Sequence, residues 1–196
     1  MNAEGLPNLK GYEVLVCVTG GIACYKSAEL TSKLIQSGAG AAVAMTESAT
    51  HFVAPLSFQA LSGREVFTSM WQSGRRYDPQ HLALTERADL MIVAPATANM
   101  IAKMAAGIAD ELVSALALSA CGACEILIAP AMNTRMWEAP ATQANLKRLS
   151  ERGVHVVGPG EGFLACGSYG KGRMAEPAEI LKAAAELLGK KPPKGK

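Results

Sequence analysis

Small polar residues and glycines directly follow three short apolar runs of the sequence. The segment from Thr19 to Ala23 brings two adjacent glycines after the first run, Thr46 follows the second, and Thr97 and Asn99 follow the third. Glycines at the start of a helix let backbone N–H groups approach an anion, and the helix dipole favours a phosphate there. The spacing matches neither the G-x-G-x-x-G nor the Walker pattern, so it predicts a mononucleotide rather than NAD or ATP. The structural alternative is a tight strand-to-helix turn whose polar side chains only cap helices.

Three other residues have side chains suited to proton transfer or to holding a carboxylate. An imidazole pKa of about 6.5 would let His81 act as an acid or base, although a lone histidine is more often a surface or packing residue. Cys166 lies in a glycine-rich segment. An exposed thiol with a pKa of about 8.5 is mostly protonated at neutral pH and can donate a proton. Asn133 follows a fourth apolar run together with Ala131 and Met132, and its uncharged amide could hold a carboxylate or merely cap a helix.

The remaining cysteines point to packing rather than to redox or metal chemistry. Cys121 and Cys124 have the C-x-x-C spacing, but they follow a predicted helix and precede a predicted strand, whereas a thioredoxin-type pair opens a helix. A single such pair with no second pair nearby predicts no zinc site. The chain has five cysteines, and an odd number argues against a complete set of disulfides, so we expect reduced thiols and a cytoplasmic location.

Composition excludes several classes of partner. The net charge is only +2, which gives no electrostatic case for binding nucleic acid or a membrane surface. No apolar run is long enough to span a bilayer, and residues 1–10 lack the layout of a signal peptide. The basic tail at residues 190–196 is expected to be a solvated terminus.

Strands and helices alternate along the chain. Buried strands are predicted by five short apolar runs, at residues 14–18, 41–45, 90–94, 126–129 and 154–157. Helices are predicted by apolar spacing and end signals at residues 23–36, 98–105, 111–119, 141–151 and 179–188. This alternation predicts an α/β fold with one doubly wound, Rossmann-like or flavodoxin-like parallel sheet that carries helices on both faces. Its binding sites should lie beyond the carboxyl ends of the strands.

We expect residues 1–196 to form a single domain with a core at about 13–188. Residues 69–80 are polar and predict a surface loop. Residues 158–172 are so rich in glycine that they predict a long loop, which in a compact domain is usually functional or disordered.

Taken together, these segments resemble the FMN flavoproteins that decarboxylate cysteine groups, in particular the phosphopantothenoylcysteine decarboxylases. The resemblance covers roughly residues 13–180, and its specificity lies in the joint order of the motifs. The segments that carry it are Thr19 to Ala23, Met45-Thr46, His81 ahead of Ala88-Asp89-Leu90, Ala94 to Asn99, Pro130 to Asn133 with Met136-Trp137, Leu164 to Gly167, and Gly172 to Met174. Arg87 departs from the pattern, since relatives often have tryptophan there.

The resemblance implies a role for each part of the site. FMN would be bound by Gly20, Gly21, Ile22, Thr46, Phe52, Pro95, Ala96, Thr97 and Asn99. Asn133, Met132 and Ala131 would bind substrate, with Asn133 holding its carboxylate. His81 would be the active-site histidine, facing the strand-end cleft, and Cys166 the acid on a flap at about 158–174 that closes over the substrate.

The implied reaction is a decarboxylation assisted by a redox cofactor. The cysteine –CH2–SH group of 4'-phosphopantothenoylcysteine is oxidised by FMN to a thioaldehyde, which accepts the electrons left when carbon dioxide departs. Reduced FMN then returns the hydride to the resulting enethiol, and Cys166 supplies the proton, giving 4'-phosphopantetheine for coenzyme A synthesis. No metal is required.

The resemblance also implies a homotrimer or a multiple of trimers, with His81 and Asn133 completing a site begun by a neighbouring chain. The synthetase that makes the substrate is a further expected partner, since it is fused to this domain in many bacteria. Two alternatives remain at this point: a peptidyl-cysteine decarboxylase, and a non-catalytic flavin-binding subunit that regulates a partner.

Overall fold

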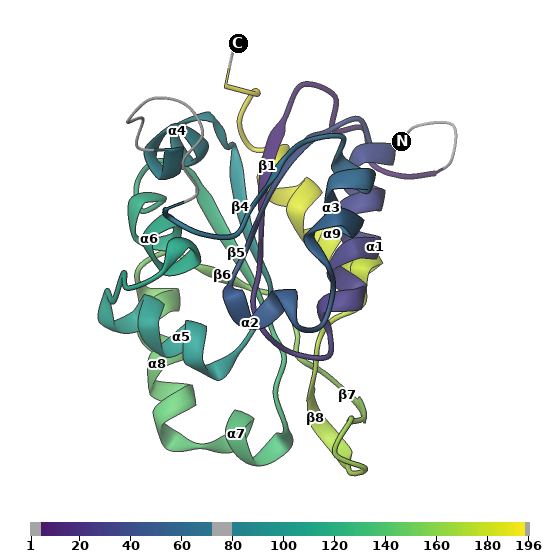
Figure 1. The fold of residues 1–196 in the computed structure, drawn as a ribbon. Coiled ribbons are helices and arrows are strands. Elements are labelled where there is room, and N and C mark those ends of the chain that lie inside the picture. The colour runs from purple at the N-terminus through teal and green to yellow at the C-terminus, as the bar shows by residue number, and fades with distance from the viewer. Residues whose placement is uncertain (1–4, 72–79, 195–196) are drawn as a thin grey trace.

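The computed structural model describes residues 5–71 and 80–194, and of residues 80–82 it describes only the backbone. Within this part, the chain forms a six-stranded parallel sheet in the order β3-β2-β1-β4-β5-β6 and a separate antiparallel hairpin of β7 and β8 (Figure 1). The strands are β1 (Glu13–Val18), β2 (Gly40–Met45), β3 (Val66–Phe67), β4 (Leu90–Ala96), β5 (Glu125–Pro130), β6 (His155–Val156), β7 (Gly160–Phe163) and β8 (Tyr169–Arg173). The helices are α1 (Cys24–Gln36), α2 (Glu47–Thr50), α3 (Pro55–Ser62), α4 (Gln80–Arg87), α5 (Ala98–Ala106), α6 (Leu112–Ser119), α7 (Thr134–Glu138), α8 (Pro140–Glu151) and α9 (Pro177–Leu188). The predicted fold class is confirmed.

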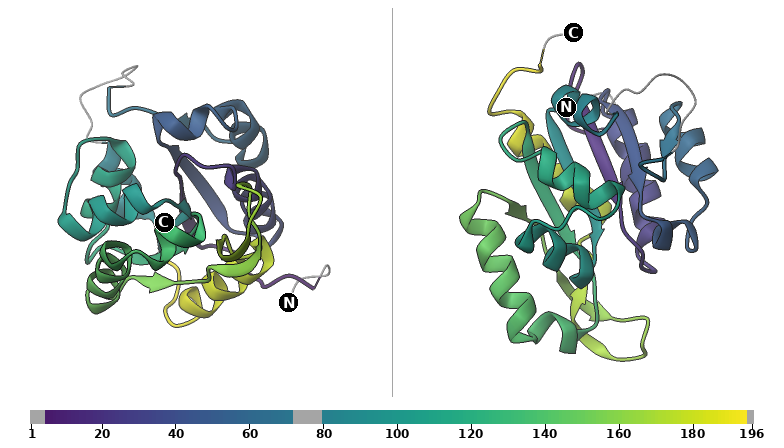
Figure 2. Two further views of the ribbon diagram at one scale, coloured as in Figure 1. Left: turned by 90° about the horizontal axis from the view of Figure 1, so that it is seen from below. Right: turned by 60° about the vertical axis from the view of Figure 1, so that its left-hand side comes forward.

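Each face of the sheet is covered by its own set of helices (Figure 2). Side chains of a strand alternate between the two faces. Val14 and Val16 of β1 therefore join α1, α3 and α9 in one core. Leu15 and Cys17 join α5, α6 and α8 in the other. Burial on both faces explains why the strands read as continuous apolar runs in the sequence.

The strand order reverses beside β1, which has β2 on one side and β4 on the other. In open sheets of this kind, ligands bind at the carboxyl ends of the strands next to such a reversal. The segments after β1 and β4 begin with Thr19 and Thr97, so the fold places the predicted polar residues at this point.

All five predicted strands and all five predicted helices are present, with boundaries that differ by a few residues. The prediction of a long loop at residues 158–172 is wrong, because most of this segment forms the hairpin of β7 and β8. Its strands pair Glu161 with Lys171 and Phe163 with Tyr169. Glycines between these residues carry no side chain, so the period-two pattern that identifies a strand is absent from the sequence.

Several short elements have no counterpart in the prediction. The helices α2, α3, α4 and α7 have between four and eight residues, and β3 has two. Segments this short contain too few residues to show a helical or strand period. The predicted loop at residues 69–80 is described only at its ends: a turn at Met70 and Trp71, and Gln80 in the first turn of α4. Residues 72–79 lie outside the described residues.

The prediction that the C-terminal tail is only solvated is wrong for residues 190–194. The hydroxyl of Tyr12 donates to the backbone oxygen of Lys191 at 2.8 Å, and the ammonium of Lys191 lies 3.0 Å from the carboxylate of Glu125. The ammonium of Lys194 donates to backbone oxygens near α4 and β5. These contacts hold the tail across the amino ends of the strands.

Candidate functional site

A cleft of about 500 Å³ opens at the carboxyl ends of β1, β2 and β4. Five of the predicted cofactor residues line it: Gly20, Gly21, Thr46, Thr97 and Asn99. We call it the strand-end cleft. Its size lies within the range of small-molecule and cofactor sites.

Thr19 joins the two strand ends that form the floor of the strand-end cleft. Its buried hydroxyl donates to the backbone oxygen of Pro95 at 2.7 Å and accepts from the backbone N–H of Thr97 at 3.2 Å. The hydroxyl of Thr97 in turn accepts from the backbone N–H of Met100 at 3.3 Å, which caps α5. Thr97 therefore caps α5 and also lines the cleft, so the two interpretations of the sequence, helix capping and cofactor binding, are compatible.

The strand-end cleft has the features of a phosphate site. Gly20 lies so close to Ser48 that a Cβ atom at position 20 would overlap the Ser48 side chain. Ala98 and Asn99, in the first turn of the nine-residue α5, line the cleft. Unpaired backbone N–H groups and the positive end of the helix dipole favour an anion there. The residues present thus fit the phosphate of a mononucleotide.

The other predicted cofactor residues lie elsewhere. Ile22 lines a second cleft and is exposed. Phe52 follows α2 and is half-exposed. The side chains of Pro95 and Ala96 are buried within β4 and line neither cleft, because both faces of that strand are covered. Pro95 acts through its backbone oxygen, which accepts from Thr19.

A second cleft, of about 380 Å³, lies between the start of α1 and the hairpin of β7 and β8. We call it the hairpin cleft. It shares Gly21, Ala131 and Met132 with the strand-end cleft, so the two clefts adjoin. Asn133 and Cys166 both line the hairpin cleft, although 33 positions separate them in the sequence. The structure thereby brings the predicted carboxylate-binding and proton-donating residues together.

Asn133 combines the two functions that the sequence left open. Its side-chain oxygen accepts from the backbone N–H of Met136 at 2.8 Å and caps α7. Its NH2 group makes no hydrogen bond to any described residue, and the side chain is exposed. The cap fixes the amide plane, which leaves the NH2 group available as a donor to a carboxylate.

Backbone contacts hold the hairpin against the segment that follows β5. The backbone N–H of Met132 donates to the backbone oxygen of Gly172 at 3.0 Å. The hydroxyl of Thr134 donates to the backbone oxygen of Lys171 at 2.8 Å. The hairpin therefore covers the residues next to Asn133.

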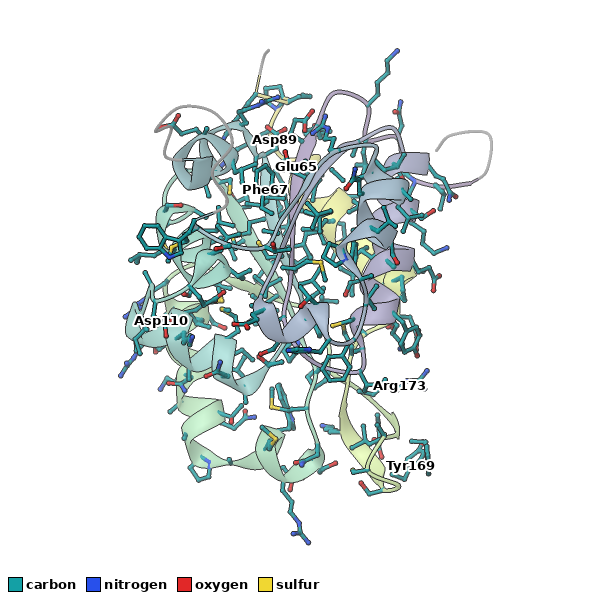
Figure 3. The ribbon with its side chains drawn as sticks, viewed as in Figure 1. Glu65, Phe67, Asp89, Asp110, Tyr169 and Arg173 are labelled. Carbon is teal, nitrogen blue, oxygen red and sulfur yellow. The ribbon has the colours of Figure 1, made fainter. Side chains whose placement is uncertain are left out.

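Charged residues fix the base of the hairpin. The buried ammonium of Lys26 donates to the carboxylate of Glu176 at 2.8 Å and lies 3.4 Å from the backbone oxygen of Met174. Arg173 donates to the same Glu176 oxygen at 2.7 Å. Figure 3 shows Arg173 near the base of the hairpin and Tyr169 near its far end. The hydrogen bond from Lys26 lowers the pKa of Glu176, so this carboxylate stays charged at neutral pH.

Gly172 allows the hairpin to reach this position. Its φ angle is +131°, and a Cβ atom there would overlap the backbone oxygen of Met132. A positive φ alone costs a non-glycine residue roughly 1–2 kcal/mol, and about 1.4 kcal/mol is a factor of ten in an equilibrium. We expect Gly172→Ala to accelerate hydrogen exchange at the Met132 amide at least about tenfold.

The matched control is Gly160→Ala in the same hairpin. A Cβ atom there would meet only the backbone oxygen of Arg173, at an ordinary 3.8 Å. Exchange at Met132 should stay at the wild-type rate in this control. Equal exchange rates in both variants would contradict the role assigned to Gly172.

Cys166 is an exposed thiol in the turn that joins β7 and β8. Its sulfur lies 3.1 Å from the hydroxyl of Ser168. This hydrogen bond lowers the pKa of Cys166 from the ordinary value assumed from the sequence. A thiol with a lowered pKa is a stronger acid, so it suits proton donation at the hairpin cleft.

The other cysteines have no such environment. Burial raises the pKa of Cys17 well above its usual value, and it raises that of Cys124 to about 11. Cys124 is thus a protonated, unreactive thiol at neutral pH, as the packing interpretation requires, whereas Cys121 is exposed, so that interpretation is wrong for Cys121. All five cysteines are free thiols.

His81 lies in the first turn of α4, and its side chain lies outside the described residues. The described side chains of α4 do not line the strand-end or hairpin cleft. Leu84 and Arg87 instead line a cavity at the amino ends of β1 and β2, together with Glu13 and Ala42. Figure 1 shows α4 near the end of the sheet opposite to the hairpin. The expectation that His81 faces the strand-end cleft of its own chain therefore gains no support from the fold.

Sequence reasoning missed several residues that line the two clefts. Thr19 and Ser48 belong to the polar segments that follow the first and second predicted strands, but neither was assigned a role in binding. Their positions next to the ends of these strands were the available signal. Tyr25 and Lys26 line the hairpin cleft from the first turn of α1, and no spacing in the sequence distinguishes them from ordinary helix residues.

In the described part of the chain, no three His, Cys, Asp or Glu side chains lie close enough to hold a metal ion. Across the same residues, none of the helices combines the length and the apolar character needed to cross a bilayer.

Comparisons with known proteins agree with this geometry. A protein-family model described as Flavoprotein matches residues 3–189. The coenzyme A biosynthesis bifunctional protein CoaBC of Bacillus subtilis (strain 168) is 49% identical over 176 residues, which cover 90% of this chain and 43% of that protein. The chain thus spans less than half the length of this curated relative.

Two solved structures have similar folds. One is a cysteine-to-serine mutant of PPC (phosphopantothenoylcysteine) decarboxylase in complex with pantothenoylaminoethenethiol. Its TM-score is 0.82 at 30% identity, and the match covers 93% of this chain and 100% of that one. The other is the FMN-dependent cysteine decarboxylase SpaF, with a TM-score of 0.79 at 30% identity, covering 91% and 96% of the two chains. This chain belongs to the flavoprotein family.

Proposed function

We propose that this protein is an FMN-dependent decarboxylase of 4'-phosphopantothenoylcysteine, acting in coenzyme A synthesis. The observation that carries the proposal is the pair of adjoining clefts. One has the features of a mononucleotide site, and the other is lined by both Asn133 and the hairpin residue Cys166. The names of the relatives supply the cofactor and the substrate class.

FMN would occupy the strand-end cleft, with its phosphate near Gly20, Gly21 and the start of α5. Thr46, Thr97 and Asn99 supply hydroxyl and amide groups along the same wall. When bound, FMN supplies the reversible hydride transfer that gives the substrate an electron sink for the loss of carbon dioxide.

The hairpin cleft would bind the cysteine end of the substrate. The NH2 group of Asn133 would donate to the substrate carboxylate without adding charge, which orients the group that leaves as carbon dioxide. Ala131 and Met132 line both clefts, so they would contact the substrate where the hairpin cleft meets the strand-end cleft. The hairpin would act as a flap that excludes water from the reactive intermediate.

Cys166 would donate the last proton to the enethiol carbon. Its exposed position and lowered pKa support this role. The enethiol complex of the related cysteine-to-serine mutant supports it as well, since a protein without the acid would retain that product.

The alternative substrate is a peptide with a C-terminal cysteine, because FMN-dependent cysteine decarboxylases share the fold. The 49% identity to the coenzyme A protein, against 30% to SpaF, favours the small molecule. We expect kcat/KM for phosphopantothenoylcysteine to exceed that for a cysteine-terminated peptide by at least about a hundredfold, measured by release of carbon dioxide. A preference for the peptide would reject the coenzyme A assignment.

We further propose that the protein is a homotrimer or a multiple of trimers whose active sites lie between subunits. The position of α4, away from both clefts, supports this: His81 can act at a site only if a neighbouring chain provides the remainder of it. In a closed ring, each interface joins two different surfaces, so one chain can supply His81 and the next Cys166.

Coexpression of His81→Asn with Cys166→Ser tests the shared site. Each site takes His81 from one chain and Cys166 from the neighbouring chain. If the two variants mix at random, each of these residues is intact in about half of the sites, so about a quarter of the sites contain both intact residues. We expect the mixture to recover that share of wild-type product formation, while each variant alone stays inactive. No recovery, or full activity in a protein that sediments as a monomer, would contradict the proposal.

The synthetase that makes the substrate remains a proposed partner, in line with the bifunctional relative. A cytoplasmic location remains part of the proposal, and the free thiols support it because the cytoplasm keeps cysteines reduced.

A further inference from the structure

The C-terminal tail lies at the end of the molecule opposite to both clefts. Figure 1 shows the C-terminus and α4 near one end and the hairpin at the other, and Figure 3 shows Asp89 near the tail. The tail is anchored to β1 and β5. Tyr12 donates to the backbone of Lys191, and the ammonium of Lys191 pairs with Glu125. The ring of Pro193 packs on Gly11: a Cβ atom added to Gly11 would lie 3.5 Å from the Cγ atom of Pro193.

Lys194 is the residue that connects this tail to α4. Its ammonium donates to three backbone oxygens, those of Ala88 and Ala123 at 2.7 Å and that of Glu86 at 3.1 Å. An ammonium has three donors, so all of them are satisfied. Its backbone N–H donates to the carboxylate of Asp89 at 2.7 Å. The other oxygen of that carboxylate accepts from the backbone of Glu13 in β1 at 2.8 Å.

These contacts place a positive charge at the carboxyl end of α4, which ends at Arg87. The last backbone oxygens of a helix lack partners within it, and the helix dipole is negative there. The ammonium of Lys194 satisfies the backbone oxygens of Glu86 and Ala88 and complements the dipole. It also joins α4 to Ala123, two residues before β5.

Within the described residues, the anchors of α4 lie in its second half. The buried hydroxyl of Thr85 lies 3.2 Å from that of Ser119 in α6, Leu84 packs against the core beside α6, and Ala88 is buried. His81 lies in the first turn, five residues before Glu86. A helix rises about 1.5 Å per residue, so the first turn lies roughly 7–8 Å beyond the Lys194 contact. A tilt about these anchors therefore displaces the first turn.

We propose that Lys194 is a positioning residue for α4 and, through α4, for His81. The proposal rests on the proposed function, in which His81 acts during oxidation of the substrate. A displacement of about 1 Å at a reacting group can lower a rate by about a hundredfold, so a contact remote from the chemistry can control it. Lys194 sets the direction of the helix and touches no reacting atom.

The test compares Lys194→Met with Lys191→Met in the full-length, FMN-loaded protein. Methionine keeps the length of the side chain and removes the ammonium. Lys191→Met removes another cation of the tail, one that pairs with Glu125 and makes no hydrogen bond to the described residues of α4. Four quantities are measured for each variant: hydrogen exchange across residues 80–88, the rate of flavin bleaching by phosphopantothenoylcysteine in a single turnover, KM, and the FMN content.

For Lys194→Met we expect exchange in α4 to become about tenfold faster and the bleaching rate to fall about tenfold. FMN content and KM should stay within about twofold of the wild type, because both clefts lie at the other end of the sheet. Lys191→Met should leave both rates within about twofold. Lys194→Arg, which restores a cation with several donors, should recover most of the bleaching rate.

Wild-type exchange and bleaching in Lys194→Met would overturn the proposal. So would equal losses in the two methionine variants, since they would show a general loosening of the tail. If the wild-type protein itself shows no bleaching, the proposed function fails, and the role of Lys194 for His81 fails with it. Exchange in α4 would still report whether Lys194 holds the helix.

Discussion

Replacing Cys166 with serine should stop the reaction at the enethiol. The variant should bind FMN, bleach it with substrate and release carbon dioxide, but it should form the saturated thiol at least about a hundredfold more slowly than the wild type. Serine keeps the size and polarity of the side chain, whereas an alcohol is a far weaker acid than a thiol. The hydrogen bond between Cys166 and Ser168 favours the cysteine further, because it lowers the pKa of the thiol.

Mass analysis of the product and a carbon dioxide assay separate the two halves of the reaction. The matched control is Cys121→Ser, which changes the other exposed cysteine, at the end of α6 and away from both clefts. That variant should make the saturated thiol at the wild-type rate. Saturated thiol at a near wild-type rate from Cys166→Ser would instead assign Cys166 a packing role in the hairpin turn.

Replacing His81 with asparagine should have the largest effect on the first half of the reaction. We expect flavin bleaching to fall at least about a thousandfold, within the range that a lost acid–base group commonly costs. FMN should remain bound, because His81 lies in α4 and the residues of the strand-end cleft come from other elements. Rapid mixing under anaerobic conditions measures the bleaching, and the absorbance of the purified protein measures the bound FMN.

His51→Asn is the control, since His51 follows the short helix α2 and lies in neither cleft. It should bleach normally. Normal bleaching in His81→Asn would remove His81 from the mechanism, and loss of FMN from that variant would show a structural rather than a chemical role.

The sequence was sufficient for five of the six strands of the sheet, because the central strands are buried on both faces; β3, with two residues, was too short to be predicted. Leu90 to Ala94, for example, are all buried in β4, so a continuous apolar run was the correct signal. The sites at the strand ends followed from the fold, because parallel strands bring their carboxyl ends to one edge. This is why Gly20, Thr46 and Thr97 could be predicted to lie together.

The hairpin could not be predicted because glycine carries no side-chain pattern. Glycines alternate with Glu161, Phe163, Tyr169 and Lys171, and the pairing across the hairpin is visible only in three dimensions. The approach of Asn133 to Cys166 has the same origin, since it depends on how the hairpin folds back. The resemblance to a family suggested this approach, but no spacing in the sequence required it.

Long-range polar contacts were also beyond the sequence. Lys194 lies 105 positions from Asp89, and Lys26 lies 150 positions from Glu176. In the sequence these lysines belong to a basic tail and to an ordinary helix. Only the fold shows that one holds α4 and that the other fixes the base of the hairpin.

The most direct test of the central claim is carbon dioxide release from carboxyl-labelled phosphopantothenoylcysteine, measured on the protein with and without FMN. We predict one labelled carbon dioxide for each molecule of saturated thiol, with no net change in the oxidation state of the flavin, and no turnover by the protein stripped of FMN. Turnover without FMN, or an FMN-loaded protein that releases no labelled carbon dioxide, would contradict the account.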